Sequence, residues 1–290
     1  MILVTGAAGK TGRTVIRTLT QQGSAVRAYV HRVAQVAASQ AAGAAEVVVG
    51  DFQDVTTLRR AMQGVHALYH ICPNMHPDEV AIGRQVIAAA LAADVEHFVY
   101  HSVLHPQTET MPHHWNKLQV EELLFAARLP FTILQPTAYM QNILAGWDKI
   151  RNQGIYTIPY RGETQIALID LEDVGAVAVT VLTQPGHIGA TYELVGTPPL
   201  TQFAVAEILA TALRRPIQVE TITQMEWERN ARAGGLSDYA IKTLLAMFVY
   251  YEEVGLVGNP NVLGWLLGRP PTSLTEFVRR IMAVTLNPDD

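Results

Sequence analysis

The first 22 residues hold a short apolar segment, a loop with three glycines and a segment with helical periodicity. The apolar segment is Ile2 to Thr5, and the glycines are Gly6, Gly9 and Gly12. Beyond the loop, apolar residues fall on one face of residues 13–22. A strand that passes through such a loop into a helix is the first unit of a Rossmann-type domain. The start of the chain therefore predicts an α/β fold.

Short apolar runs alternate with helical patterns as far as Gln135. We predict six strands, at residues 2–5, 25–30, 46–49, 67–71, 97–101 and 131–134. Helices lie between them, for example from Asn116 to Arg128, where Pro130 stops the helix. Several strands are almost continuous apolar runs, as is usual when helices cover both faces. We therefore predict a doubly wound parallel sheet.

Beyond Gln135, glycine and proline interrupt shorter elements, which indicates a smaller, mainly helical substrate lobe. We expect helices over 201–213 and 274–284 and an apolar stretch over 241–251. The buried face of the first helix should hold Phe203, Ala206, Leu209 and Leu213. The predicted Rossmann domain covers residues 1–145, with 166–184 packing back onto it. Residues 146–165 and 185–290 form the predicted lobe.

Composition and charge limit the partners. The chain has 290 residues, 49% hydrophobic, with a formal net charge of −5. Nucleic acids and anionic membranes require concentrated basic surfaces, so we expect a small-molecule partner and a monomer or homodimer. Its one cysteine, Cys72, cannot form an internal disulfide, no apolar run has the length of a membrane span, and no leader pattern precedes the first strand. We expect a cytoplasmic protein.

The neighbouring histidines His105, His113 and His114 lack a cysteine or carboxylate at ligand spacing, so we expect no metal.

The glycine loop predicts a cofactor site. Gly6 permits a tight turn, Gly9 lets the backbone approach a pyrophosphate, and Gly12 allows close helix packing, while the helix N-terminus offers free N–H groups. The alternative is that three glycines only shape a turn. We predict binding of NAD(P) by the loop residues Gly6, Ala8, Gly9, Lys10, Thr11 and Gly12.

Two further segments bear on the nucleotide. About twenty positions after the loop, where a carboxylate would bind a ribose 2′-hydroxyl, the chain has His31 and Arg32, so we favour NADP(H) over NAD(H). Alternatively, these residues only end a strand at the surface. Asp51 and Phe52 follow the third strand and suit an adenine edge and face. The alternative is that Asp51 caps the next helix and Phe52 belongs to the core.

Six motifs together resemble one known family. The sequence is similar to atypical short-chain dehydrogenases/reductases of the NmrA-like group, which are related to the isoflavone-reductase-like enzymes. The resemblance spans roughly residues 1–200 and rests on these motifs: Thr5–Gly12, Gly50–Asp51, Phe98–Ser102, His113–Lys117, Phe131–Asn142 and Leu171–Gly175.

The resemblance implies catalytic roles for particular residues. The superfamily uses a serine, a tyrosine and a lysine four residues after the tyrosine. This chain retains Ser102 and Lys117, but His113 stands at the tyrosine position and is our candidate proton source. The resemblance also places Pro136 and Tyr139 near the cofactor, where Tyr139 would replace the missing phenol. The alternative for Tyr139 is a core aromatic.

The loop after the fourth strand contains Ile71, Cys72 and Pro73. Because ligands of open α/β sheets bind at the carboxyl ends of the strands, we expect these residues to border the nicotinamide. We assign Cys72 no covalent role.

Two functions remain open from the sequence. The first is an NADPH-dependent oxidoreductase that reduces a small apolar or aromatic acceptor such as a quinone, an enone or a dye. Aromatic residues after Gln135 would line its substrate site, although most of them also suit a core: Tyr139–Trp147, Tyr156–Tyr160, Trp227, Met247, Phe248, Tyr250, Tyr251 and Trp265. The second, implied by the family, is a non-catalytic NAD(P)-binding redox sensor that acts through a protein partner.

Overall fold

The structure is a computed structural model that describes residues 1–286 of the chain. Contacts divide the chain into two compact units. The first contains residues 1–136 and 174–193, and the second contains residues 137–173 and the described residues from 194 onward. The segment 166–184 is thus divided between the two units at residue 174. Each unit is described separately.

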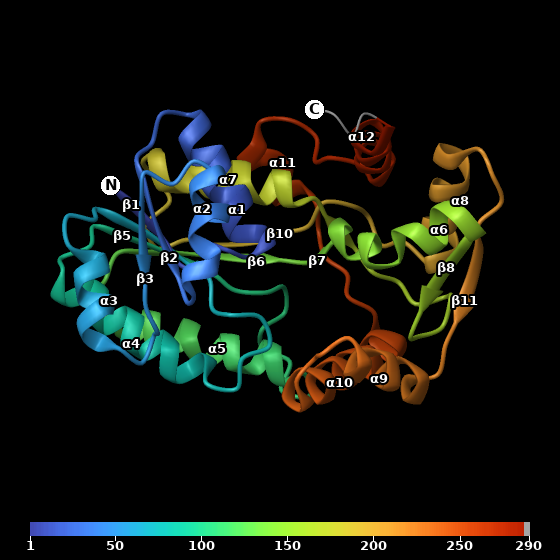
Figure 1. Ribbon diagram of the computed structural model, residues 1–290, viewed down its shortest axis with the longest axis horizontal. Coiled ribbons are helices and arrows are strands. Elements are labelled where there is room, and N and C mark those ends of the chain that lie inside the picture. The colour runs from blue at the N-terminus through green and yellow to red at the C-terminus, as the bar shows by residue number, and fades with distance from the viewer. Residues whose placement is uncertain (287–290) are drawn as a thin grey trace. The chain divides into compact units, whose positions relative to one another are not determined.

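A seven-stranded sheet forms the centre of the first unit (Figure 1). Its order is β3-β2-β1-β4-β5-β6-β10, and the pairs from β3 through β6 are parallel. The strands are β1 (Ile2–Val4), β2 (Val26–Val30), β3 (Glu46–Val49), β4 (Ala67–His70), β5 (His97–His101), β6 (Phe131–Pro136) and β10 (Thr191–Leu194). The predicted Rossmann-type fold is confirmed. The six-strand prediction missed β10, because its sequence is a polar edge segment without an apolar run.

Helices cover both faces of this sheet, as Figure 1 shows. On one face lie α1 (Lys10–Gln21), α2 (Val36–Ala41) and α7 (Leu171–Thr183), and on the other lie α3 (Val55–Met62), α4 (Glu79–Ala92) and α5 (Pro112–Ala126). A short 3-10 helix, η1 (Val33–Gln35), precedes α2. The prediction that α5 begins at Asn116 was wrong. Proline at the first position supplies the helical φ angle without losing a hydrogen bond, so the helix begins at Pro112.

The packing of α4 against α5 depends on a glycine. A Cβ atom on Gly83 would lie 2.8 Å from both methyl groups of Val120. Gly83 therefore allows the two helices to approach closely. One turn earlier on each helix stand Glu79 and Lys117, whose side chains meet at 2.7 Å. The small residue thus brings two charged side chains together inside the protein.

The second unit contains two small parallel sheets and most of the C-terminal helices. Strand β7 (Ala138–Tyr139) pairs with β9 (Leu168–Ile169), and β8 (Ile155–Ile158) pairs with β11 (Gln218–Thr221). The helices are η2 (Met140–Gly146), α6 (Trp147–Gln153), α8 (Gln202–Leu213), α9 (Gln224–Ala233), α10 (Asp238–Val254), α11 (Asn261–Leu267) and α12 (Leu274–Leu286). Within residues 1–286, the structure contains no helix with the length and apolar character that a bilayer crossing requires.

Two buried aspartates hold the C-terminal segment of the second unit. Arg280 donates to Asp170 at 2.5 Å, and Arg269 donates to Asp173 at 2.6 Å. The backbone N–H of Thr272 also donates to Asp173, at 2.7 Å. Both carboxylates are fully buried, so loss of either arginine would leave an unpaired charge inside the protein. The Leu171–Gly175 motif therefore has a structural role here.

Helix α8 buries Ala206 and Leu209 of the expected face but not Phe203. Its buried apolar side chains are Val205, Ala206 and Leu209, whereas Phe203 is 48% exposed. The prediction for Phe203 was wrong because its ring lies against Gly162, which has no side chain to occupy that space.

We predict that Gly83→Ala destabilises the protein by about 1–3 kcal/mol, because the added methyl group overlaps Val120. Urea unfolding measures the change. Gly264→Ala is the matched control, since a Cβ there meets its first neighbours at 3.7 Å in a helix interior, and it should be neutral or stabilising. A double variant with Val120→Ala should recover part of the loss. Equal effects of Gly83→Ala and Gly264→Ala would contradict the packing argument.

Candidate cofactor and active site

The glycine loop between β1 and α1 leaves no room for side chains at two positions. Gly6 has a φ of +60°, and a Cβ atom there would lie 2.8 Å from the carbonyl oxygen of Ile71. A Cβ on Gly12 would lie 2.4 Å from the carbonyl oxygen of Gly6 and 2.7 Å from the Cα of Ala7. Only glycine fits these contacts. The predicted tight turn at Gly6 and the close packing at Gly12 are confirmed.

Thr5 fixes the loop to the neighbouring strand. Its hydroxyl group accepts a hydrogen bond from the backbone N–H of Ile71 at 3.0 Å and lies 2.8 Å from Nδ1 of His70. Both partners come from the end of β4. The start of the glycine loop and the loop after β4 are therefore held side by side at the carboxyl edge of the sheet.

The first turn of α1 is suited to an anion. Helix α1 begins after Gly9, and among residues 1–286 no side chain caps its first turn. The backbone N–H groups of Lys10, Thr11 and Gly12 therefore point out of the helix end with its partial positive charge. A pyrophosphate fits this cradle, and the glycines allow its close approach.

The end of β2 presents basic side chains to solvent. The backbone N–H groups of His31 and Arg32 both donate to the side chain of Gln35, at 3.1 and 2.9 Å. Gln35 thus orders the turn, and both side chains are exposed. Nδ1 of His31 lies 3.6 Å from a carboxylate oxygen of Asp51. The described geometry leaves Arg32 accessible to a phosphate.

The structure tests whether Asp51 caps the next helix and whether Phe52 belongs to the core. Asp54 caps α3, accepting from the N–H groups of Thr56 and Thr57 at 3.1 Å, so the alternative that Asp51 caps this helix is wrong. Phe52 is half-buried, with its ring 5.3 Å from the ring of Tyr29. It packs against the edge of the core and keeps one part accessible.

Lys117 and Glu79 form a buried ion pair at the ends of β4 and β5. Nζ of Lys117 donates to Oε1 of Glu79 at 2.7 Å and to the carbonyl oxygen of His101, the last residue of β5, at 3.0 Å. Their exposed fractions are 4% and 1%. The ammonium group also lies 5.1 Å from the ring centre of Tyr100. The lysine retained from the family pattern is therefore held firmly and has its counter-charge beside it.

Glu79 is the centre of this cluster. The hydroxyl group of Tyr100 donates to Oε1 at 3.1 Å, and Nδ1 of His113 lies 3.7 Å from Oε2. Among the described residues, Oε2 has no hydrogen-bond partner. Burial and then the nearby charge of Glu79 raise the pKa of the Cys72 thiol well above its usual value, so Cys72 remains a thiol.

Ser102 contacts a second buried carboxylate. Its hydroxyl group donates to Oε1 of Glu121, and the side-chain amide of Gln135 donates to both oxygens of Glu121 at 2.9 and 3.0 Å. Burial raises the pKa of Glu121. In this arrangement the proton of Ser102 is directed at Glu121, and its oxygen remains an acceptor for a further group.

Burial keeps the histidines of this region neutral. It lowers the pKa of His70 and of His101 to about 3, with a smaller contribution from Lys117. The pKa of His113 lies well below its usual value, first from burial and then from the charge of Lys117. A neutral imidazole donates only its one N–H, so a proton delivered through His113 has to be replaced from another group.

Sequence reasoning found Lys117, His113 and Ser102 but missed the carboxylates beside them. Glu121 stands four residues after Lys117 on α5, a helical spacing that identifies a neighbour. Glu79 gives no such signal, since it lies 38 positions before Lys117 and meets it only through the packing of α4 on α5. Pro136 ends β6 in the first unit, while Tyr139 belongs to β7 in the second unit.

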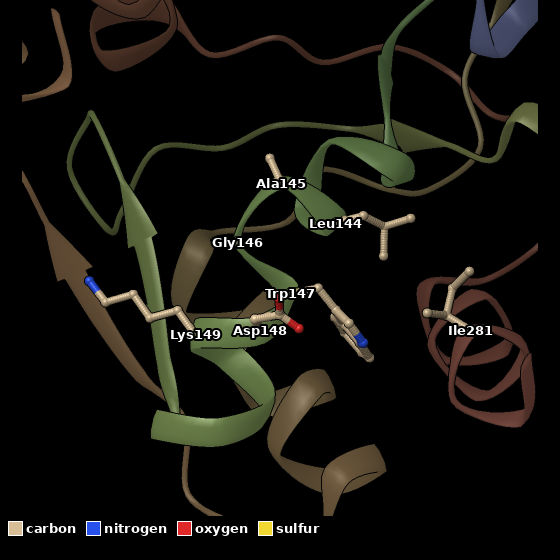
Figure 2. A pocket seen from close by; sticks show the side chains of 7 residues that line it. All are labelled: Leu144, Ala145, Gly146, Trp147, Asp148, Lys149 and Ile281. Atoms are coloured by element: carbon tan, nitrogen blue, oxygen red, sulfur yellow. The ribbon is translucent and has the colours of Figure 1, made fainter. Parts of the chain in front are cut away.

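The second unit has an open pocket of about 580 Å³, shown in Figure 2, whose lining is mostly apolar but includes Asp148. Leu144, Trp147 and Ile281 face it from η2, α6 and α12. The side chain of Lys149 points away, because its ammonium group contacts Thr157 and Glu220.

The predicted aromatic residues of the second unit differ in burial. The rings of Trp227 and Tyr160 both pack edge-on against Phe248, at 4.8 and 5.8 Å, and Tyr251 is buried. The rings of Trp227, Tyr160 and Phe248 are half-buried and pack on one another, so these three side chains have a packing role, as the alternative interpretation allowed. Trp265 is 77% exposed.

Residues 1–279 match the sequence model of the NmrA-like family. The chain belongs to the NmrA-like family. The resemblance found in the sequence motifs is thereby confirmed over nearly the whole chain.

The chain is similar over nearly its whole length to two curated relatives and one solved structure. An NAD(P)H azoreductase of Xenophilus azovorans is 30% identical, covering 96% of this chain and 97% of its own length. Quinone oxidoreductase 2 of Escherichia coli is 29% identical, covering 98% and 99%. A crystal structure of the NADPH-dependent quinone oxidoreductase of Escherichia coli in complex with NADPH superposes with a TM-score of 0.84 at 28% identity, covering 97% and 100%.

The buried histidines predict how stability depends on pH. An unfolded histidine has a pKa near 6.5, whereas His70 and His101 have a pKa of about 3 in the fold. Below pH ~6.5 the unfolded chain therefore binds protons at histidines that stay unprotonated in the native state. The free energy of unfolding should fall from pH ~6.5 to ~3, by up to about 1.4 kcal/mol per pH unit for each histidine. Above pH ~6.5 this contribution is complete.

Urea unfolding at a series of pH values measures this slope. His101→Gln should reduce it, and His31→Gln, which changes a histidine whose side chain is 66% exposed, should not. A slope that is the same in the wild type and in His101→Gln would refute the assignment.

Proposed function

We propose that this protein is an NADPH-dependent reductase of a small, flat, apolar or aromatic acceptor such as a quinone, an enone or an azo dye. The observation that carries the proposal is the buried Lys117 at the carboxyl edge of the sheet, beside an anion cradle that only glycine can form. Ligands of open α/β sheets bind at this edge, where the strand order reverses between β1 and β4.

The first unit supplies the groups that hold the cofactor. The N–H groups of Lys10, Thr11 and Gly12 bind the pyrophosphate, and Arg32 binds the 2′-phosphate. Phe52 and Asp51 receive the adenine. On the other side of the cradle, Ile71, Cys72 and Pro73 border the nicotinamide, together with Pro136.

The chemistry requires a hydride and a proton. Bound NADPH supplies the hydride from its nicotinamide ring. Lys117 holds the ribose and opposes the buried charge of Glu79, so that this carboxylate does not disfavour the negative charge that develops on a reduced carbonyl or azo group. His113 passes a proton to that group through its N–H, and solvent replaces this proton.

The acceptor class is inferred from the relatives. The azoreductase and the quinone oxidoreductase align with this chain over nearly its whole length, at 30% and 29% identity. Their names describe conjugated acceptors, and the aromatic and apolar residues of the second unit are compatible with such molecules.

We place this activity in the cytoplasm, with a small molecule and no nucleic acid as partner. The net charge of −5 and the buried free thiol of Cys72 support this placement.

We predict that Arg32→Glu weakens NADPH binding by roughly tenfold or more and changes NADH binding little, because only NADPH carries the 2′-phosphate that Arg32 would bind. Isothermal titration calorimetry measures both affinities. The matched control is Arg59→Glu, which changes an exposed arginine that lies on α3, away from the end of β2. It should not alter the preference for NADPH over NADH. Equal loss for NADPH and NADH would show that Arg32 does not read the 2′-phosphate.

We predict that the purified protein oxidises NADPH with members of a panel of quinones, enones and azo dyes. Lys117→Met should slow turnover by about a hundredfold, because it leaves the buried carboxylate of Glu79 unopposed near the negative charge that develops on the acceptor. Absorbance at the NADPH band measures the rate, and circular dichroism confirms that the variant folds. Lys242→Ala, at an exposed lysine on α10, should leave the rate unchanged. Tight NADPH binding without oxidation by any acceptor would favour the redox sensor instead.

A further inference from the structure

The Lys117–Glu79 pair places two opposite charges where the nicotinamide ring would bind. Lys117 donates to the carbonyl oxygen that ends β5, and Glu79 lies against Cys72 in the loop after β4. Both charged groups are almost completely buried, so water screens them little.

The two redox states of the cofactor differ in charge at one place. The nicotinamide ring carries a positive charge in NADP⁺ and none in NADPH, while the phosphates and the adenine are the same in both. A fixed charge near the ring therefore changes the affinity for NADP⁺ and has little effect on the affinity for NADPH. A lone ammonium group at this edge would oppose the oxidised ring.

We propose that Glu79 sets the relative affinity of this site for oxidised and reduced cofactor by cancelling the charge of Lys117 beside the nicotinamide. The inference rests on the proposed binding of NADPH. Glu79 acts through its charge, on Lys117 and on the ring, so it needs no contact with the acceptor.

The hydrogen bonding of Glu79 supports this role. Its Oε1 accepts from Lys117 and Tyr100, but its Oε2 has no hydrogen-bond partner within the described part of the chain. Buried carboxylate oxygens are normally satisfied. A carboxylate with one unpaired oxygen retains negative charge that can balance a second positive group, and the oxidised nicotinamide ring is such a group. His113, 3.7 Å from Oε2, is neutral and does not balance it.

A merely structural role for Glu79 would give a different result. If Glu79 only stabilised the packing of α4 on α5, its loss would weaken NADP⁺ and NADPH binding alike. The charge argument instead predicts opposite signs for removal of the carboxylate and removal of the ammonium group. It also predicts no effect on 2′,5′-ADP, which lacks the nicotinamide.

The experiment is calorimetric titration of NADP⁺, NADPH and 2′,5′-ADP into four proteins: the wild type, Glu79→Gln, Lys117→Met and the double variant. In Glu79→Gln we expect the ratio of the Kd for NADP⁺ to the Kd for NADPH to rise roughly tenfold, since a unit charge acting through the protein interior changes a binding constant by about that factor. In Lys117→Met the ratio should fall, and in the neutral double variant it should return to the wild-type value.

The controls separate charge from shape. Glu79→Asp keeps the charge and should recover most of the wild-type ratio. Glu122→Gln removes an exposed carboxylate on α5 and should leave the ratio unchanged. The affinity for 2′,5′-ADP should stay within about twofold in all variants that fold.

Each outcome bears on a different claim. If the wild type binds neither NADP⁺ nor NADPH, the proposed function fails. If the wild type binds both and the ratio in Glu79→Gln equals the wild-type ratio, the inference about Glu79 alone is overturned. If Glu79→Gln does not fold, the comparison of Lys117→Met with the double variant decides, because equal ratios in those two proteins would overturn the inference as well.

Discussion

An ammonium group and a carboxylate group that are both shielded from water have to remain together, because either one alone inside a protein costs several kcal/mol. Lys117 and Glu79 impose this constraint on the first unit. It fixes the distance between α4 and α5, and Gly83 is the residue that allows the helices to come that close. The same pair keeps a positive charge at the end of β5. The packing of α4 on α5 and the electrostatics of the site therefore depend on the same ion pair.

The glycine loop allows a phosphate to approach the backbone closely. Gly6 and Gly12 lie against backbone atoms that a Cβ would displace, and Thr5 ties the loop to the end of β4. The loop is thus held at the same sheet edge as the buried lysine. Membership of the NmrA-like family, whose sequence model covers residues 1–279, agrees with this arrangement. A cradle for phosphates and a compensated charge at one edge are what a nicotinamide cofactor requires.

Much of the first unit could be predicted because its signals are local. Six parallel strands, the loop and the first helix follow from apolar runs and glycine spacing, which depend on neighbours along the chain. The polar strand β10 was missed because its place in the sheet depends on β6 and leaves no apolar run in its own sequence. The start of α5 was misplaced because the first residues of the helix, from Pro112, are mostly polar and show no apolar periodicity. Phe203 was misplaced because its packing depends on a distant glycine.

The sequence by itself determined the fold class, the phosphate cradle, the lysine at position 117 and the basic turn at Arg32, since each is written in residues close together in the chain. Only the tertiary structure decided what surrounds that lysine. Glu79 lies 38 positions away and has no spacing that marks it, and Ser102 is engaged by Glu121 rather than free. The physical reason is that burial and charge compensation depend on which helices pack together. A linear pattern shows that a lysine is present, but the fold decides whether its charge is opposed.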